Sequence, residues 1–187
     1  MLQKSYKSKR LELRPISLND FNIWKNACLA GLPKKNKWDK DPPLPRKKIF
    51  ISMIARLRKK ARLDQLYVWG IFAKKNLVGF IDISIIERYS IQNANLGYKI
   101  FNHCWRQGYA FEALSEIIKP ALRDLKLNRL EAVIDLDNKV SIALVKKLQF
   151  RKEGIRKNYW YQNNRWDDQV VYIVDRSELK MTPLKVE

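Results

Sequence analysis

Hydrophobic and polar positions alternate over several short stretches of the 187-residue chain, which predicts half-buried β-strands. Leu11-Glu12-Leu13-Arg14 alternates just ahead of Pro15 and predicts the first of these strands. Apolar runs bounded by turn residues predict the others, over residues 66–73, 77–86, 95–101, 130–136, 155–161 and 170–174. Turns are expected at Lys74-Lys75-Asn76 and at Asn163-Asn164.

Apolar residues at helical spacing predict helices between the strands. The first follows the capping stretch Ser17 to Asn19, and the second can run from Ile49 to Leu66 after a Pro42-Pro43-Leu44-Pro45 loop. The third opens after Gly108 and should be kinked, or ended and restarted, at Pro120. A short fourth helix follows Asp137-Asn138, so the order is a β-meander, then strand–helix–strand–helix, then a hairpin.

The length and composition fit one folded domain over residues 1–187 with a short tail at 176–187. Hydrophobic residues make up 46%, enough for a core, and no uncharged run reaches the ~18 residues of a membrane span. The charged stretch Met1 to Arg10 lacks the apolar region of a secretory signal. Cys28 and Cys104 are therefore interpreted as free thiols, His103 alone argues against a metal site, and a cytoplasmic protein is expected.

The net charge of +19 is concentrated in two stretches. Residues 1–10 hold four basic residues and no acid, and residues 33–62 hold twelve basic residues against Asp39 and Asp41. The second stretch is explained equally well by a solvated lysine-rich face or by a surface for a polyanion, most plausibly RNA or an RNA-rich particle. An anionic membrane ranks below RNA, because the short apolar stripe of the Ile49–Leu66 helix is needed for the core.

The loop from Trp105 to Ala110 is the first candidate for chemistry. It leads directly into a helix, whose first N–H groups and partial positive charge suit a pyrophosphate. Gly108 and the small Ala110 let phosphates approach the backbone, and Arg106 adds a formal charge. A single glycine before a helix is more often only a turn, so this loop needs support from other motifs.

Further motifs follow in order along the chain, and with them it resembles the GNAT superfamily of N-acetyltransferases. Within that superfamily it is most similar to the branch that acetylates the N-terminal amines of ribosomal proteins. The resemblance covers about residues 11 to 174 and leaves only the basic segment 33–62 poorly matched. It is carried by these motifs: Gly97-Tyr98-Lys99-Ile100, Trp105 through Gly108 to Glu112-Ala113-Leu114, Arg129-Leu130-Glu131-Ala132, Asn138 with Ser141, and Trp166-Asp167-Asp168.

The resemblance implies the GNAT fold, an α/β (α+β) arrangement with a central, mostly antiparallel mixed sheet that is splayed in the middle and flanked by about four helices. It implies acetyl-CoA as co-substrate and no metal. The pantetheine arm would pair with the backbone of Tyr98, Lys99 and Ile100. The pyrophosphate would lie on the N–H groups of Arg106, Gln107, Gly108, Tyr109, Ala110 and Phe111.

The resemblance also implies that Asn138 holds a pantetheine amide and that Ser141 faces the thioester sulfur, where it protonates or hydrogen-bonds the leaving thiolate. Asn138 could instead cap the fourth helix, or leave that cap to Asp137. A serine on an ordinary helix face is the alternative for Ser141.

Three positions depart from the family pattern. Asn95 replaces a glutamate that serves many relatives as general base, and Asn95 cannot take up a proton. Gln149 replaces the glycine of Leu-Gly-Phe, and Val145 occupies the position of a tyrosine that many relatives use as acid. Asp82, Ser84 or a backbone carbonyl acting through water could replace the missing base, although Asp82 also suits a strand edge.

A site without a strong base favours an α-amine as acceptor. An α-amine has a pKa of about 7.8 and is partly neutral near pH 7.4, whereas a lysine side chain with a pKa of about 10.4 is almost fully charged there. The preferred acceptor is therefore a protein N-terminus such as that of a ribosomal protein, attacking acetyl-CoA directly in a ternary complex. Residues 34–62 would dock the enzyme on ribosomal RNA or on a pre-ribosomal particle. The alternatives are a small-molecule amine acceptor and a non-catalytic GNAT-fold module that binds RNA or protein.

Overall fold

The computed structural model describes residues 4–39, 43–162 and 164–184. Within them the strands are β1 (Tyr6–Lys7), β2 (Leu11–Arg14), β3 (Leu66–Ala73), β4 (Asn76–Glu87), β5 (Asn93–Ile100), β6 (Arg129–Asp135), β7 (Arg151–Gln162) and β8 (Arg165–Asp175). The α-helices are α1 (Phe21–Leu29), α2 (Lys47–Arg62), α3 (Tyr109–Asp124) and α4 (Lys139–Lys147), and short 3₁₀ turns cover η1 (Leu18–Asp20) and η2 (Asn102–Cys104).

The strands form one mixed sheet in the order β1-β2-β3-β4-β5-β6-β8-β7. β1 with β2, β2 with β3, β6 with β8 and β7 with β8 are antiparallel, whereas β5 and β6 are parallel. The parallel ladder joins only three residue pairs, from Asn93 opposite Arg129 to Asn95 opposite Glu131. The predicted α+β fold with a mixed, mostly antiparallel sheet is confirmed, and the short ladder accords with a sheet that opens after β5.

The chain forms two compact units, residues 1–83 with 98–117 and residues 84–97 with 118–187. The first unit has an aromatic core in which α1 and α2 meet. The Trp24 and Phe50 ring centroids lie 5.0 Å apart, and both side chains are almost fully buried. Around them the core contains Ile16, Ala27, Cys28, Ile54, Phe72, Leu77 and Phe101. Phe50 and Ile54 of α2 are thus part of the protein interior, whereas Ile49 and Ile51 of the same helix are exposed.

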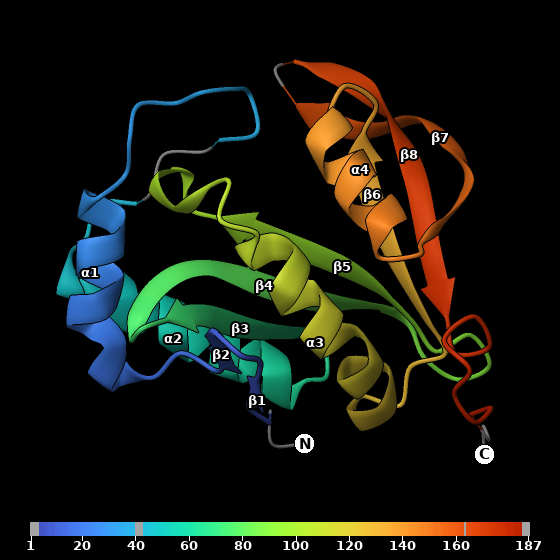
Figure 1. Ribbon diagram of the computed structural model, residues 1–187, viewed down its shortest axis with the longest axis horizontal. Helices are drawn as coiled ribbons and strands as arrows, with labels where there is room; N and C mark the ends of the chain where they lie inside the picture. Colours follow the sequence, from blue (N-terminus) through green and yellow to red (C-terminus); the bar gives the residue numbers. More distant parts are fainter. Residues whose placement is uncertain (1–3, 40–42, 163, 185–187) are drawn as a thin grey trace. The chain divides into compact units, whose positions relative to one another are not determined.

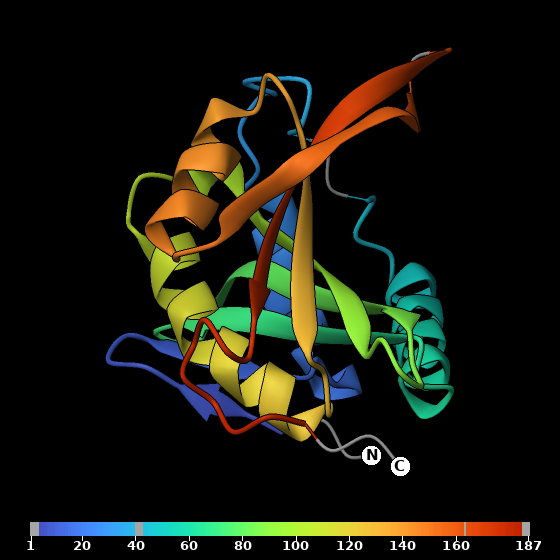
Figure 2. The same cartoon turned by 90° about the vertical axis from the view of Figure 1, so that its right-hand side faces the viewer.

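The second unit is built on β6, β8 and β7, with α4 lying along these strands (Figures 1 and 2). The run from Val170 to Val174 is buried throughout, because the central strand β8 has neighbours on both edges. Val145 of α4 is fully buried. The family's tyrosine position therefore holds a core residue in this chain, and the acid that many relatives place there is absent at position 145.

Several element boundaries agree with the hydrophobic pattern and others do not. Strands Leu11–Arg14 and Leu66–Ala73 have the predicted bounds. The closing strands are longer than predicted, because exposed polar residues at their outer ends pair in the hairpin without contributing to the core. The prediction that Pro120 ends α3 is wrong, since one helix runs through it from Tyr109 to Asp124. Ile117, Ala121 and Leu122 on either side of the proline are fully buried, and their packing stabilises the helix against the lost hydrogen bond.

The aromatic residues near the tip of the closing hairpin lie outside the core. Tyr159, Trp160, Tyr161 and Trp166 are exposed. Two register shifts in the β7–β8 ladder interrupt the alternation, one of them between Arg156 and Trp160. Tyr161 and Trp166 instead contact each other, with ring centroids 5.2 Å apart.

A left-handed residue ends α4. Gln149 has φ 66°, its N–H donates to Lys146 O, and the N–H of Phe150 donates to Val145 O at 3.0 Å. These two bonds form a Schellman motif, which normally carries glycine at this position. The backbone turn that the family forms with glycine is thus present here with glutamine, at a steric cost.

Gln149→Gly is therefore expected to raise the free energy of unfolding by about 0.5–1 kcal/mol, because glycine adopts this conformation without strain. Urea unfolding followed by circular dichroism measures the change. Lys146→Gly is the control, since it places glycine inside the same helix and should destabilise the protein by about 1 kcal/mol. A lower urea midpoint for Gln149→Gly would contradict this account.

Some sequence predictions concern residues outside the described ranges, namely Met1 to Gln3, Lys40 to Pro42, Asn163 and the end of the tail at 185–187. Asn164, which completes the predicted turn, has φ 59°. Within the tail, Arg176 is buried and donates to Leu122 O at 3.1 Å.

Among the helices the structure describes, none combines the length and the apolar character that crossing a bilayer requires.

Candidate active site

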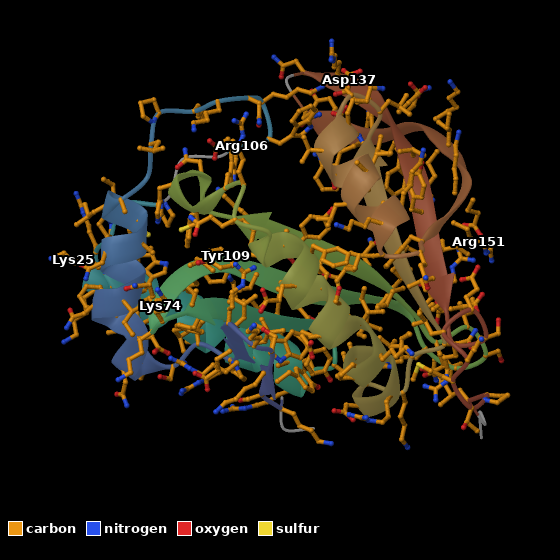
Figure 3. All side chains as sticks on the ribbon, in the orientation of Figure 1. Lys25, Lys74, Arg106, Tyr109, Asp137 and Arg151 are labelled. Carbon is orange, nitrogen blue, oxygen red and sulfur yellow. The ribbon has the colours of Figure 1, made fainter. Side chains whose placement is uncertain are left out.

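The loop between β5 and α3 has the backbone geometry of an anion-binding turn. Arg106 has φ 61° and Gly108 has φ 77°, whereas Gln107 between them has negative φ. Such alternation turns successive N–H groups towards one concavity. Arg106 and Gly108 are exposed, Tyr109 begins α3, and Figure 3 shows the Arg106 and Tyr109 side chains at this junction. The bond from Glu112 N–H to Gly108 O at 3.1 Å starts the helical pattern, so the N–H groups up to Phe111 belong to the helix N-terminus.

Glu112 fastens this helix start to the β1–β2 hairpin. Its Oε1 accepts from Ser8 Oγ at 2.6 Å and from the Arg10 N–H at 3.0 Å, and its Oε2 accepts from Arg10 Nε at 2.7 Å. Arg10 also donates to Gln107 O at 3.0 Å. Burial alone would raise the pKa of Glu112, but the bonds from Ser8 and Arg10 lower it, so the carboxylate stays ionised. This clamp fixes the loop, and sequence motifs gave no sign of it.

A second clasp holds the chain just before the loop. The buried Asn102 forms a reciprocal pair with the backbone of Leu32, with Leu32 N–H to Oδ1 at 2.8 Å and Nδ2 to Leu32 O at 2.7 Å. Its Nδ2 also donates to Asp39 at 2.9 Å. Trp105 Nε1 donates to Ile100 O at 2.7 Å. The segment after α1 and the end of β5 are thus tied to the same loop.

Tyr98, Lys99 and Ile100 form the end of β5 and are each half-buried. Beside them, Phe101 N–H donates to Val78 O at 2.9 Å. A Cβ added to Gly79 would lie only 2.2 Å from Lys99 O, so β4 requires glycine where it passes this segment. The three predicted pantetheine-binding residues and the six loop residues therefore lie in the same unit, separated along the chain only by the clasp around Asn102.

Asn138 and Ser141 meet at the start of α4, in the second unit. Asn138 is the N-cap, and its Oδ1 accepts from the Ser141 N–H at 3.2 Å. Of the two alternatives predicted for this cap, Asn138 rather than Asp137 therefore provides it. The exposed Asp137 precedes the helix (Figure 3), and its N–H donates to Asp135 Oδ1. Among the described residues the cap engages only the Oδ1 atom of the Asn138 amide, and both residues are half-buried.

Asn95 lies on β5 in the second unit, opposite Glu131 of β6. Its Oδ1 is buried and has no hydrogen-bond partner among the described residues. A buried amide oxygen without a partner can accept a hydrogen bond from a bound ligand. The replacement of glutamate by Asn95 thus removes a base and leaves a hydrogen-bond acceptor at the same position.

Asp82 has the properties of a general base. It lies on β4, and strand alternation puts it on the same face as Phe80, which packs against the core cluster containing Cys28. Its side chain is half-buried and forms no hydrogen bond or ion pair with any other described residue. Burial raises the pKa of the Asp82 carboxyl above its ordinary value. The hydrophobic pattern favoured a strand-edge carboxylate at this position, and burial would not raise the pKa of such a group.

The two cysteines and the histidine are not arranged as a nucleophile or as metal ligands. Cys28 and Cys104 are both free and buried, and burial raises the pKa of Cys28 to about 11 and raises that of Cys104 as well, which suppresses thiolate formation. His103 stacks on Phe101 with ring centroids 5.8 Å apart, and burial lowers its pKa. Across the described ranges, no group of three or more His, Cys, Asp or Glu side chains could hold a metal ion.

Comparison with known families adds to this geometry. Residues 10–151 match the family model described as an acetyltransferase (GNAT) domain. The chain belongs to the GNAT acetyltransferases. The match covers more than half of the chain and includes β2 through α4, so both the loop at Arg106–Phe111 and the Asn138–Ser141 cap lie inside it. The resemblance inferred from the motifs is confirmed.

Individual GNAT relatives show which members the chain is similar to. It is 35% identical over 108 residues to the uncharacterized N-acetyltransferase YoaA of Bacillus subtilis, which is 57% of this chain and 60% of that protein. It is 32% identical over 107 residues to the [ribosomal protein uS5]-alanine N-acetyltransferase of Escherichia coli, covering 56% of this chain and 55% of that protein. The alignments thus span less than two thirds of these two curated relatives.

A solved structure supports the fold over nearly the whole chain. RimJ of Mycobacterium smegmatis, in complex with CoA-disulfide, aligns with a TM-score of 0.81 and 22% identity over 96% of this chain and 90% of that one. Neighbours of this GNAT protein therefore bind CoA, and its relatives include ribosomal-protein acetyltransferases.

Proposed function

We propose that this GNAT protein is an acetyl-CoA-dependent N-acetyltransferase that acts on the N-terminal α-amine of a protein, such as a ribosomal protein. The single observation that carries the proposal is the loop at Arg106–Gly108, whose left-handed turns lead into the N-terminus of α3. This backbone suits a pyrophosphate through its N–H groups and its partial positive charge. The family assignment supports acetyl-CoA as the molecule that carries this pyrophosphate.

Acetyl-CoA supplies the thioester, and residues of this chain bind and orient it. The N–H groups of Arg106, Gln107, Gly108, Tyr109, Ala110 and Phe111 receive the pyrophosphate. The backbone of Tyr98–Ile100 pairs with the pantetheine arm as an added strand would. The Asn138 Nδ2 group, which the helix cap leaves for another acceptor, binds a pantetheine carbonyl.

Ser141 and Asp82 take the two proton-handling roles of direct transfer. The amine attacks the thioester carbonyl, its N–H proton passes to the Asp82 carboxylate, directly or through one water, and the departing thiolate receives a hydrogen bond or a proton from Ser141 Oγ. The raised pKa of Asp82 supports this role, since a stronger base accepts the proton more readily. Asn95 contributes its unpartnered Oδ1 as an acceptor that orients the amine.

The α-amine is preferred as acceptor because it is partly neutral near pH 7.4, with a pKa of about 7.8. The relative that acetylates ribosomal protein uS5 supports a protein N-terminus over a small-molecule amine, which remains the second enzymatic candidate. The ribosomal RNA contact through residues 34–62, the cytoplasmic location, the single domain over 1–187 and the absence of a metal requirement are parts of the same proposal.

Calorimetric titration with acetyl-CoA tests the loop. Wild-type protein is expected to bind acetyl-CoA with micromolar affinity, and Gly108→Val is expected to bind at least about tenfold more weakly, because valine strongly disfavours φ 77°. Gly154→Val is the matched control, since Gly154 has no atom within 4 Å of an added Cβ and lies in a strand. Equal affinity for wild type and Gly108→Val, or no binding by wild type, would contradict the proposed loop.

A further inference from the structure

Helix α2 is strongly cationic. Its sixteen residues contain no acidic residue, and Arg46 directly precedes it as another cation. All of its cations are exposed: Lys47, Lys48, Arg56, Arg58, Lys59, Lys60 and Arg62. Together with Arg46 they are called the α2 basic face. The basic segment is evident from the sequence, and the structure shows that these eight cations lie on and next to one helix.

The α2 basic face has no carboxylate partners among the described residues. Several arginines elsewhere in the chain are paired with carboxylates. Arg10 binds Glu112 at 2.6 Å, Arg14 binds Asp20 at 2.7 Å and Arg156 binds Glu131 at 2.6 Å. These ion pairs stabilise the fold, whereas the cations of the α2 basic face have no ion pair among the described residues that would explain their presence.

Intrinsic helix stability does not explain the α2 basic face. Lys59, Lys60 and Arg62 suit the negative end of the helix dipole, but Lys47 and Lys48 lie in the first turn, where positive charge is unfavourable. Like charges one turn apart, such as Arg56 with Lys60 and Arg58 with Arg62, repel each other. The helix tolerates this repulsion because Phe50 and Ile54 pack in the core. The charge is thus unfavourable for the isolated protein and needs an external polyanion to become favourable.

The residues of the α2 basic face indicate which kind of partner it binds. Phe50 and Ile54 are buried inside the first unit, and the apolar side chains that α2 exposes, Ile49 and Ile51, do not form the large apolar face with which a helix enters a membrane surface. Figure 2 shows the outer side of α2 turned away from the neighbouring strands. Protein interfaces are depleted in lysine and enriched in aromatic residues, and α2 has lysines and no exposed aromatic residue on this side. Single-stranded RNA is bound by stacking on aromatic side chains, which the outer side also lacks.

We propose that the α2 basic face docks the protein on the sugar-phosphate backbone of double-stranded RNA. A sixteen-residue helix is about 24 Å long, and α2 carries its cations in the first turn and again from Arg56 to Arg62. Proteins recognise duplex RNA mainly by shape and by phosphate and 2′-hydroxyl contacts, which suits a row of lysines and arginines without base-reading groups. The inference deepens the RNA contact of the proposed function but does not depend on acetyl transfer.

Fluorescence anisotropy of the full-length protein with a labelled 20-base-pair RNA duplex of arbitrary sequence tests this docking between 50 and 200 mM NaCl. The variant carries Lys47→Gln, Lys48→Gln, Lys59→Gln and Lys60→Gln. The matched control removes four exposed lysines elsewhere through Lys25→Gln, Lys119→Gln, Lys146→Gln and Lys152→Gln. Both variants change the net charge by the same amount, so only the position of the charge differs.

Wild type is expected to bind the duplex with an affinity that falls steeply with salt. The α2 variant should bind at least about tenfold more weakly than wild type at 100 mM NaCl. The slope of log K against log[salt], where K is the association constant, should become shallower by about three units, whereas both changes should be much smaller in the control. Equal losses in both variants, tighter binding of a 20-nucleotide single strand or tighter binding to vesicles of 30% phosphatidylserine would each overturn the inference. Acetyl-CoA affinity, measured alongside, should be unchanged in the α2 variant, so this inference and the proposed enzyme can fail independently.

Discussion

Asp82→Asn is expected to lower kcat/KM for acetylation of an N-terminal peptide by about 10²-fold at pH 6.5, because the amide cannot accept the amine proton. The loss should shrink as the pH rises through about 7.8, where the acceptor amine becomes neutral without help. In the wild type, activity should rise with pH through the pKa of Asp82, which burial raises above its ordinary value. Initial rates over pH 5.5–9 with purified protein measure both effects.

Ser141→Ala is the comparison for this pH profile. Its hydroxyl is proposed to act on the leaving thiolate, so its loss should lower kcat while the dependence on amine protonation stays as in wild type. Acetyl-CoA affinity should be retained in both variants. An Asp82→Asn enzyme with wild-type rates at every pH would assign the proton transfer to Ser84 or to a backbone carbonyl instead.

The second large effect is on stability, at Glu131. This side chain is buried, and it accepts from Arg156 Nη2 at 2.6 Å, from Asn93 Nδ2 at 2.6 Å and from Arg129 Nη2 at 3.0 Å. Glu131→Gln is expected to lower the free energy of unfolding by about 3 kcal/mol, because it leaves two partly buried guanidinium groups without their shared charge. Urea unfolding at pH 7 measures the change.

Glu153→Gln is the matched control. Glu153 also pairs with Arg129 but is exposed, so its removal should change the free energy of unfolding by less than about 1 kcal/mol. Burial alone would raise the pKa of Glu131, but the bonds from Asn93 and Arg156 lower it. A lowered pKa contributes stability above the ordinary value near 4.5, and that contribution is lost as the pH falls through the lower folded-state pKa. The difference in the free energy of unfolding between wild type and Glu131→Gln should therefore become smaller at acid pH. A difference that does not change with pH would contradict a charge-based role for Glu131.

The sequence predicted the local order of the fold because hydrophobic periodicity is a local property. Strands such as Leu66–Ala73 are apolar runs bounded by turn residues, and their bounds follow from that pattern. The pattern did not predict the long β7–β8 hairpin, whose outer residues pair through the backbone while their side chains are exposed. Pro120 shows the opposite case, in which tertiary packing overrides a local preference.

In the candidate site, too, local features could be predicted from the sequence and long-range contacts could not. The loop at Gly108 and the Asn138 cap lie next to helix starts and were recognisable from short motifs. The Glu112 clamp joins residues 102 to 104 positions apart, and no local pattern carries such a contact. Asp82 looked like an ordinary strand carboxylate until its burial was known, because a sequence does not show which polar side chains are removed from water.

The measurement that tests the central claim most directly is acetyl transfer to a pair of peptides, followed by mass spectrometry. One peptide has a free α-amine and no lysine, and the other has a blocked N-terminus and one free lysine. The account predicts that acetyl-CoA and the wild-type protein acetylate the first peptide in preference to the second at pH 7.4, and that Asp82→Asn slows this transfer. No transfer to either peptide, or preferred transfer to the lysine, would contradict the assignment of the protein as an α-amine acetyltransferase.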